Sequence, residues 1–144
     1  PRPSWRYEEA AQAGRTFGVL LDTSGSMDRS LLAAALGSIA SYSAARDVNR
    51  VRVVFCDAAP YDQGYMEAAD IAGSDKVRGR GGTVLQPGVE LLEHAPDFPR
   101  QAPLLVITDC ECDRLNLYGR DHAFLVPRGR SLPFPPKGPV FYLE

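Results

Sequence analysis

The sequence feature that most constrains the fold is an apolar run, Phe17 to Leu21, that stops abruptly at the acidic residue Asp22. Five apolar or small residues bounded by a turn signal are typical of a strand buried on both faces of a sheet. Two hydroxyls follow at alternate positions, Ser24 and Ser26. Open α/β sheets bind their ligands at the carboxyl ends of such strands. A carboxylate and two hydroxyls are hard oxygen ligands, which suit Mg²⁺, Mn²⁺ or Ca²⁺ rather than zinc.

The rest of the chain alternates between strand and helix patterns. Leu32, Leu36, Ile39 and Ser43 form one stripe at helical spacing. Helices are predicted at Met27–Arg46 and Val84–His94, with a weak helical turn at Glu67–Ser74 and a glycine-rich loop at Asp75–Thr83. Strands are predicted at Val51–Cys56, Pro60–Met66 (an edge strand), Leu104–Thr108, Ala123–Val126 and Val140–Leu143. This alternation predicts an α/β fold with a mainly parallel sheet.

Length and composition limit the classes of protein that remain. A chain of 144 residues is expected to form one domain, here residues 16–144, preceded by an arm or linker remnant at residues 1–15. The net charge of −2 argues against general nucleic-acid binding. No apolar run is long enough to span a membrane. Three cysteines are an odd number, which argues against a disulfide framework and favours a cytoplasmic location. The chain starts without methionine, so we expect an excised domain or processed fragment.

Two later segments repeat the chemistry of the first. Gly81-Gly82-Thr83 precedes a predicted helix, and Thr108-Asp109 ends a predicted buried strand. With Asp22, Ser24 and Ser26 as D-x-S-x-S, these segments resemble the metal-ion-dependent adhesion site (MIDAS) of von Willebrand factor A (VWA) domains. The resemblance covers roughly Thr16 to Asp109. It implies a doubly wound, Rossmann-like fold with helices on both faces of the sheet.

The resemblance also implies a role for each residue. Ser24 and Ser26 would bind the cation directly, and Thr83 would bind it directly or through water. Asp22 and Asp109 would hold coordinated waters and orient the serines. Such an octahedral ion keeps an open position that favours an incoming carboxylate, which here would be an acidic residue of a protein partner.

A narrower resemblance concerns the short carboxyl-terminal part, which has too little room for a full helix after Asp109. The motifs D-T-S-G-S-M, F-C-D, G-R-G-G-T-x-L-Q-P-G and I-T-D resemble the VWA-like carboxyl-terminal domain of bacterial metallopeptidase-like proteins. This resemblance implies an upstream metallopeptidase-like domain and a MoxR-type AAA+ ATPase as a partner. No H-E-x-x-H occurs in this chain, so we expect the non-enzymatic binding half.

Two other functions remain open. Asp22 and a metal could serve a hydrolase or phosphotransfer domain, although Ser24 stands where a haloacid dehalogenase would have its second aspartate, and G-x-S-x-G is absent. The chain could also be a degenerate scaffold that binds no metal, because Cys110 replaces the glycine that the family usually has after the acid.

Several residues near these motifs have an ordinary interpretation beside a functional one. Cys56, Cys110 and Cys112 are expected to be inert thiols, with a soft-metal or redox site as the alternative. Arg78 and Arg80 are expected to be solvated loop charges, although they could steer an acidic partner. Asp57 is expected to form a turn. His94 and His122 are expected to make surface or cap contacts.

Overall fold

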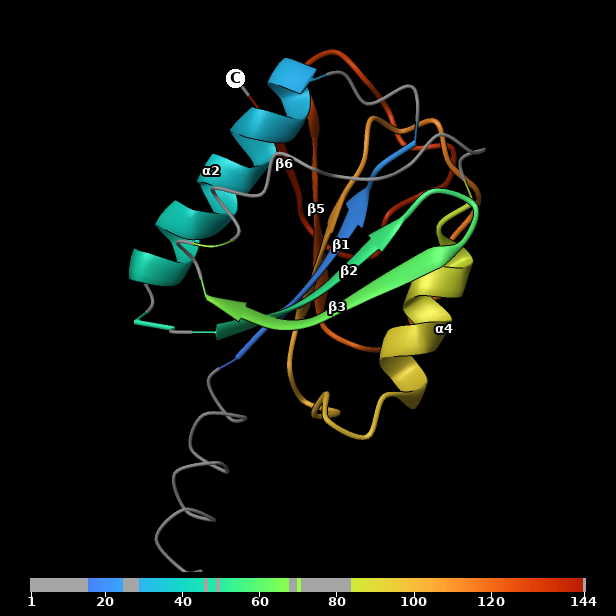
Figure 1. Cartoon of the computed structure of the whole chain (residues 1–144). Helices are drawn as coiled ribbons and strands as arrows, with labels where there is room; N and C mark the ends of the chain where they lie inside the picture. The colour runs from blue at the N-terminus through green and yellow to red at the C-terminus, as the bar shows by residue number, and fades with distance from the viewer. Residues whose placement is uncertain are drawn as a thin grey trace, which may run out of the picture.

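A single sheet with a helix on each side forms the body of the computed structural model (Figure 1). The structure describes residues 16–24, 29–45, 47–48, 50–67, 70 and 84–143. Within these ranges the strands are β1 (Gly18–Asp22), β2 (Arg50–Cys56), β3 (Pro60–Glu67), β4 (Leu104–Ile107), β5 (His122–Pro127) and β6 (Val140–Leu143). The helices of the same part are α2 (Arg29–Ala45) and α4 (Gln86–His94).

Strand β1 lies at the centre of the sheet, whose order is β3-β2-β1-β4-β5-β6. It pairs in parallel with β2 on one side and with β4 on the other. Strands β5 and β6 continue the parallel arrangement, and β3 pairs with β2 in the antiparallel direction. All five residues of β1 are buried, which confirms a strand covered on both faces. The predicted α/β fold with a mainly parallel sheet is therefore confirmed.

The two faces of the sheet form two separate cores. Successive residues of a strand point to opposite faces, so Val19 and Leu21 pack on the α2 side while Leu20 packs on the α4 side. The buried α2 residues of the first core are Ala35, Leu36 and Ile39. The α4 residues of the second core are Val89 and Leu92. Figure 1 shows the two helices on opposite sides of the sheet, as the resemblance implied.

Helix α2 buries the stripe that the sequence predicted. Leu36, Ile39 and Ser43 are at most 5% exposed, and Leu32 is partly buried. Gly37 lies on the exposed side of the helix. The buried stripe therefore accounts for the attachment of α2 to the sheet, and Gly37 plays no part in it.

Helix α4 lies very close to the sheet because Gly88 has no side chain. A Cβ atom at this position would collide with the Leu20 side chain of β1 and touch Cys56 of β2. Gly88 thus allows the helix backbone to lie close to Leu20 in the middle of β1 and to Cys56 at the carboxyl end of β2.

The carboxyl-terminal part is short, as the sequence predicted. Residues 108–121 and 128–139 connect parallel strands, and the structure, which describes them completely, has no helix there. Leu115, Leu117 and Phe134 from these two loops fill the core on the α4 side. The loops therefore take the place of helices on that face.

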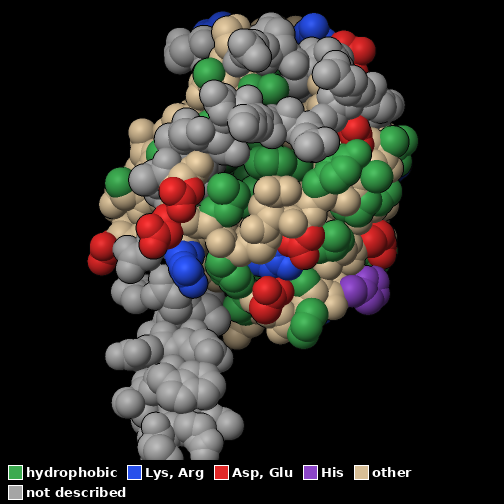
Figure 2. All heavy atoms as spheres, viewed as in Figure 1, with side chains coloured by type: hydrophobic (Ala, Val, Ile, Leu, Met, Phe, Trp, Pro, Cys, Tyr) green, Lys and Arg blue, Asp and Glu red, His purple; other side chains and the backbone are tan. Residues whose placement is uncertain are grey.

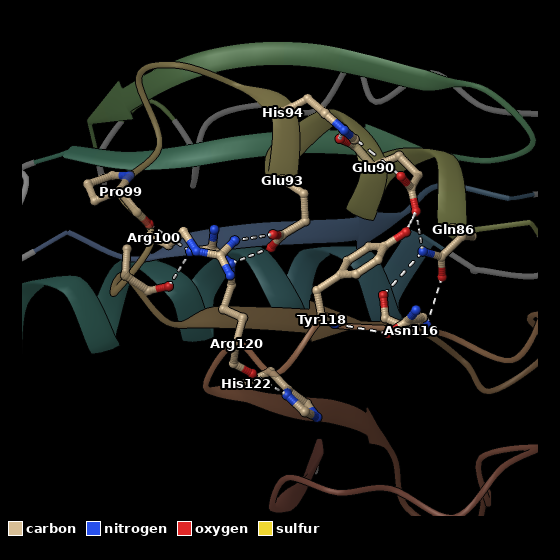
Figure 3. Close-up of polar contacts among 11 residues, drawn as sticks. Gln86, Glu90, Glu93, His94, Pro99, Arg100, Asn116, Tyr118, Arg120 and His122 are labelled. Carbon is tan, nitrogen blue, oxygen red and sulfur yellow. Dashed lines mark hydrogen bonds and ion pairs between the residues drawn. The ribbon is translucent and has the colours of Figure 1, made fainter.

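The first of these loops is also joined to α4 by polar contacts (Figure 3). Arg120 donates to Glu93 at 2.7 Å and to the backbone oxygens of Pro99 and Ala102. Its guanidinium lies over the Phe98 ring, 4.3 Å from the centroid. Since Arg120 and Glu93 are both buried, this pair fixes the carboxyl-terminal end of α4 to the loop before β5.

Most predicted boundaries agree with the structure within two residues, and one difference is informative. Helix α4 begins at Gln86 rather than Val84, with Leu85 at its N-cap position, and the backbone N–H of Val84 donates to the oxygen of Asp57. The predicted arm at residues 1–15 and loop at Asp75–Thr83 lie outside the described residues, as does most of the predicted turn at Glu67–Ser74.

Candidate functional site

The candidate site is at the carboxyl ends of the two central parallel strands. Asp22 is the last residue of β1, and Thr108 and Asp109 directly follow the neighbouring strand β4. The chain proceeds from β1 to β2 on one side and adds β4 on the other, so the strand order reverses here. This reversal is the position at which open α/β sheets bind ligands.

Asp22 is completely buried, and its carboxylate organises both segments around it. The backbone N–H of Ser24 donates to Oδ1 at 2.9 Å, and the hydroxyl of Thr108 donates to Oδ2 at 2.7 Å. Burial raises the pKa of the Asp22 carboxyl, hydrogen bonds with Ser24 and Thr108 oppose the rise, and the charge of Asp109 adds to it. Asp22 thus ties the loop after β1 to the end of β4.

Asp109 is 1% exposed and only half satisfied. Its Oδ1 accepts a hydrogen bond from the backbone N–H of Glu111 at 3.0 Å. Its Oδ2 is buried and has no hydrogen-bond partner among the residues that the structure describes. Arg130 donates to the backbone oxygen of Asp109 at 3.4 Å. The site therefore contains two buried carboxylates, and of their four oxygens Oδ2 of Asp109 is the one without a hydrogen-bond partner among the described residues.

Cys110 has a backbone φ of 78°, in the left-handed region that favours glycine. Because this residue directly follows Asp109, the loop turns sharply after the acid. Glycine adopts this conformation without strain, whereas Cys110 adopts it at a steric cost.

The predicted ligands are only partly within the described residues. Asp22, Ser24 and Asp109 are all buried at the same edge of the sheet. Ser26 and Thr83 lie outside the described residues, as do Arg78 and Arg80. The two carboxylates and the first serine are thus brought together as the sequence indicated.

Asp57, at the end of β2, forms a turn, as predicted. Its Oδ1 accepts hydrogen bonds from the backbone N–H groups of Ala58 at 2.6 Å and Ala59 at 3.1 Å. The histidines make local contacts, also as predicted. His94 Nδ1 lies 2.8 Å from the oxygen of Glu90, and His122 Nδ1 lies 2.7 Å from that of Arg120.

Asp113, which the sequence patterns did not single out, holds the start of α4. Its Oδ1 accepts from the backbone N–H of Leu85 at 2.7 Å and its Oδ2 from that of Gln86 at 3.2 Å. The N-cap position of the helix is Leu85, whose apolar side chain cannot accept a hydrogen bond, and no signal in the sequence pointed to Asp113 in its place. A helix without its own cap requires an acceptor from elsewhere.

The three cysteines are free and form no disulfide. Burial raises the pKa of Cys56 and of Cys112 to about 12 and that of Cys110 to about 11. The Cys56 thiol donates to the backbone oxygen of Val84 at 3.4 Å. Among the described residues, no three His, Cys, Asp or Glu side chains gather closely enough to hold a metal ion. The candidate site differs from such a cluster because it combines two carboxylates with hydroxyls.

The mainly parallel sheet with a helix on each side is the fold of a VWA-like α/β domain. The chain belongs to the family described as VWA-like domain (DUF2201), whose model matches residues 17–135. VWA-like domains are generally non-catalytic, so membership suggests a protein-interaction module.

A solved structure with a similar fold is an aerotolerance-related membrane protein from Bacteroides fragilis NCTC 9343 that carries multiple mutations to serines. The TM-score is 0.62 and the sequence identity 13%, over 90% of this chain and 91% of that one. This likeness concerns the fold alone. A comparison with curated proteins gave no match.

Two observations on the described residues concern membranes and charged partners. Neither described helix is long and apolar enough to cross a membrane. On the face shown in Figure 2, basic side chains are interspersed with acidic and hydrophobic ones and do not form a patch.

Proposed function

We propose that this domain is a non-enzymatic, divalent-cation-dependent protein-binding module. The observation that supports it best is the buried Oδ2 atom of Asp109, which has no hydrogen-bond partner among the described residues. A buried carboxylate oxygen without a partner is costly, and so is the repulsion between Asp22 and Asp109. A hard cation or its coordinated water relieves both costs.

The proposed site consists of the five residues that the resemblance implied, which bind the ion directly or hold its coordinated waters: Asp22, Ser24, Ser26, Thr83 and Asp109. Mg²⁺ is the proposed cation, with Mn²⁺ or Ca²⁺ as substitutes, because all the donors are hard oxygens. Asp22 already hydrogen-bonds the backbone and side chain of Ser24, which suits a residue that orients a ligand rather than binding the ion itself.

The partner proposed for the site is a protein with an accessible aspartate or glutamate. Two carboxylates and three neutral hydroxyls leave an octahedral ion with an open position, which a carboxylate fills best. By resemblance, the domain works in the cytoplasm within a larger bacterial protein that has an upstream metallopeptidase-like domain. By the same resemblance, a MoxR-type AAA+ ATPase is the partner.

The experiment is a calorimetric titration of the metal-free protein with Mg²⁺ and Mn²⁺, together with melting curves. We expect binding and a raised melting temperature, since a ligand at 100 times its Kd adds about 2.7 kcal/mol when it binds only the folded state. Asp109→Asn, which keeps the shape of the side chain, should abolish both effects. Ser24→Ala should reduce them.

Asp121→Asn is the matched control, because Asp121 is exposed and precedes β5 at the opposite end of the sheet. It should bind the cation as the wild type does. An unchanged melting temperature of the wild type with either cation, or an equal rise in Asp109→Asn, would contradict the proposal. Metal-dependent turnover of a phosphoester or peptide, lost in Asp22→Asn, would instead favour an enzyme.

A further inference from the structure

The described sheet has two edge strands, β3 and β6, and their sequences differ in character (Figure 1). An edge strand presents unpaired backbone N–H and C=O groups, and charged residues, proline or a bulge usually prevent another chain from pairing with them. Strand β3 has all three features: Pro60 at its start, the exposed Asp62 within it, and a register shift in its pairing with β2. This edge is therefore protected against an added strand.

Strand β6 has none of these features. Its sequence is V-F-Y-L, without charge, proline or glycine, and its pairing with β5 is regular. Phe141 is 56% exposed and Tyr142 is 52% exposed, the largest values among the large hydrophobic side chains of the described residues. The unprotected edge is thus also the place where the most exposed aromatic side chains lie, and such an edge accepts a further strand.

The hydrogen bonds to β5 show which backbone groups of β6 remain for a partner. In a strand the N–H and C=O groups of one residue point to the same side, and successive residues alternate. The oxygen of Pro139 accepts from the N–H of Phe124 at 2.9 Å, so the odd-numbered residues here direct their backbone groups toward β5. The backbone groups of Val140 and Tyr142 therefore point away from the sheet.

The side chains of β6 alternate between the two faces of the sheet. Leu143 is 6% exposed and packs in the core on the α2 side, which places Phe141 on the same face. Val140 packs partly against the core on the α4 side, and Tyr142 shares that face.

We propose that β6 is a dimerisation edge, to which a second copy of this chain adds its own β6 in the antiparallel direction. A two-fold axis through Phe141, perpendicular to the sheet, pairs Val140 with Tyr142 of the second copy. These are the residues whose backbone groups point outward, so each such pair exchanges both hydrogen bonds. Phe141 then lies opposite its own copy in a non-hydrogen-bonded pair, in which side chains approach most closely.

This register also brings compatible side chains together. On the α2 face, Phe141 pairs with an aromatic ring identical to its own, and on the α4 face Tyr142 pairs with the β-branched Val140, both of which are favourable cross-strand pairs. An axis through Tyr142 would instead place Phe141 opposite Leu143, whose side chain is already buried in the core. Because β6 complements itself in one register, the proposed occupant of the edge is a second copy rather than an unrelated strand.

The antiparallel pairing reverses the second sheet relative to the first. The carboxyl ends of the parallel strands, where the candidate sites are, would thus lie at opposite ends of one continuous sheet. Dimerisation of this kind requires no cation and is independent of the proposed function.

The first test is sedimentation equilibrium of the chain in EDTA from about 10 µM to about 1 mM, because an interface of short strands is small and such dimers are weak. The apparent mass should rise with concentration toward that of a dimer. Phe141→Lys should raise the Kd of the dimer at least about tenfold, since like charges would then lie directly opposite each other.

Tyr61→Lys is the matched control, because Tyr61 is an exposed aromatic residue of the other edge strand, β3. It should leave the Kd of the dimer unchanged. Both substitutions replace exposed side chains, so melting curves should show that both variants are folded.

Disulfide formation tests the register. The Cα atoms of a non-hydrogen-bonded pair lie about 4.5 Å apart, which a disulfide can bridge. Phe141→Cys should therefore form a covalent dimer under oxidation by copper phenanthroline, with the wild type as the baseline for the native cysteines. Tyr142→Cys should not exceed that baseline, because each Tyr142 lies opposite Val140 and not opposite its own copy.

An apparent mass that stays at the monomer value up to the highest concentration would overturn the proposal. So would a dimer whose Kd is unchanged by Phe141→Lys, or is raised equally by Tyr61→Lys. A dimer that Tyr142→Cys cross-links as fast as Phe141→Cys would show another arrangement and overturn it as well.

Discussion

Arg52 shows how a single buried charge can hold three elements together. Its side chain is 3% exposed on β2, and it bonds Asp62 of β3 through two nitrogens and Asp97 of the α4–β4 connection at 3.2 Å. It also lies over the Tyr65 ring, 5.8 Å from the centroid. A buried guanidinium requires such partners, because an unpaired charge in the interior costs several kcal/mol.

Asp62→Asn should therefore destabilise the protein. Since the Asp62 side chain is 43% exposed, water screens the pair, and we expect a loss of about 1 kcal/mol at neutral pH. Hydrogen bonds from Arg52 lower the pKa of Asp62 below its usual 3.8. Its contribution is thus present above pH 3.8 and is lost as the pH falls through the lowered pKa.

Urea unfolding of both proteins on either side of pH 3.8 tests this expectation. The difference in unfolding free energy should shrink on the acid side. A difference that stays constant across this range would show that the ion pair contributes no pH dependence. Asp121→Asn is again a suitable control, because its carboxylate is exposed.

The thiols should be slow to react at mildly alkaline pH. Only the thiolate is nucleophilic, and burial raises the pKa of Cys56 and of Cys112 to about 12. We expect modification by Ellman's reagent to be at least about 100-fold slower in the native protein than in denaturant. One thiol reacting rapidly in the native protein would contradict this expectation, and Cys112→Ser would identify it as that residue or exclude it.

At the scale of elements, α2 contains a glycine that its packing does not require. Gly37 is exposed, and a Cβ atom there would meet nothing within 4 Å. Glycine in a helix interior costs about 0.5–1 kcal/mol relative to alanine. Gly37→Ala should therefore raise the unfolding free energy by up to that amount, measured by chemical denaturation.

Gly64 of β3 is the matched control for this substitution. A Cβ atom there would also meet nothing within 4 Å, but its φ is 67°, which side chains rarely adopt. Gly64→Ala should thus destabilise the protein, although the surrounding space is the same. Similar effects of the two substitutions would refute the argument from backbone conformation.

Helix α4 shows where prediction from sequence stops. The apolar spacing of Val89 and Leu92 indicated a helix, and Pro87 indicated its first turn. The cap could not be predicted, because Asp113 is 28 residues from Leu85 and no local pattern connects them. Propensity and periodicity describe neighbours in sequence, whereas this helix begins where a distant carboxylate satisfies its backbone.

For the whole molecule, continuous apolar runs predicted the parallel strands well, because burial on both faces leaves few sequence alternatives. The meeting of Asp22 and Asp109 followed from two such runs that each end in an acid. The buried pairs of Arg52 and Arg120 were not predicted, since their partners depend on packing between elements far apart in the chain. The positive φ of Cys110 was likewise visible only in the structure.

The central position of β1, between strands from distant parts of the sequence, determines when the candidate site can form during synthesis of the chain. Thr108 and Asp22 are 86 residues apart in sequence although their side chains are bonded. In a growing polypeptide, Asp22 therefore leaves the ribosome long before β4 has been synthesised. During that interval its carboxylate stays hydrated. The two acids can meet only after β4 has been synthesised, which makes the candidate site a late product of translation.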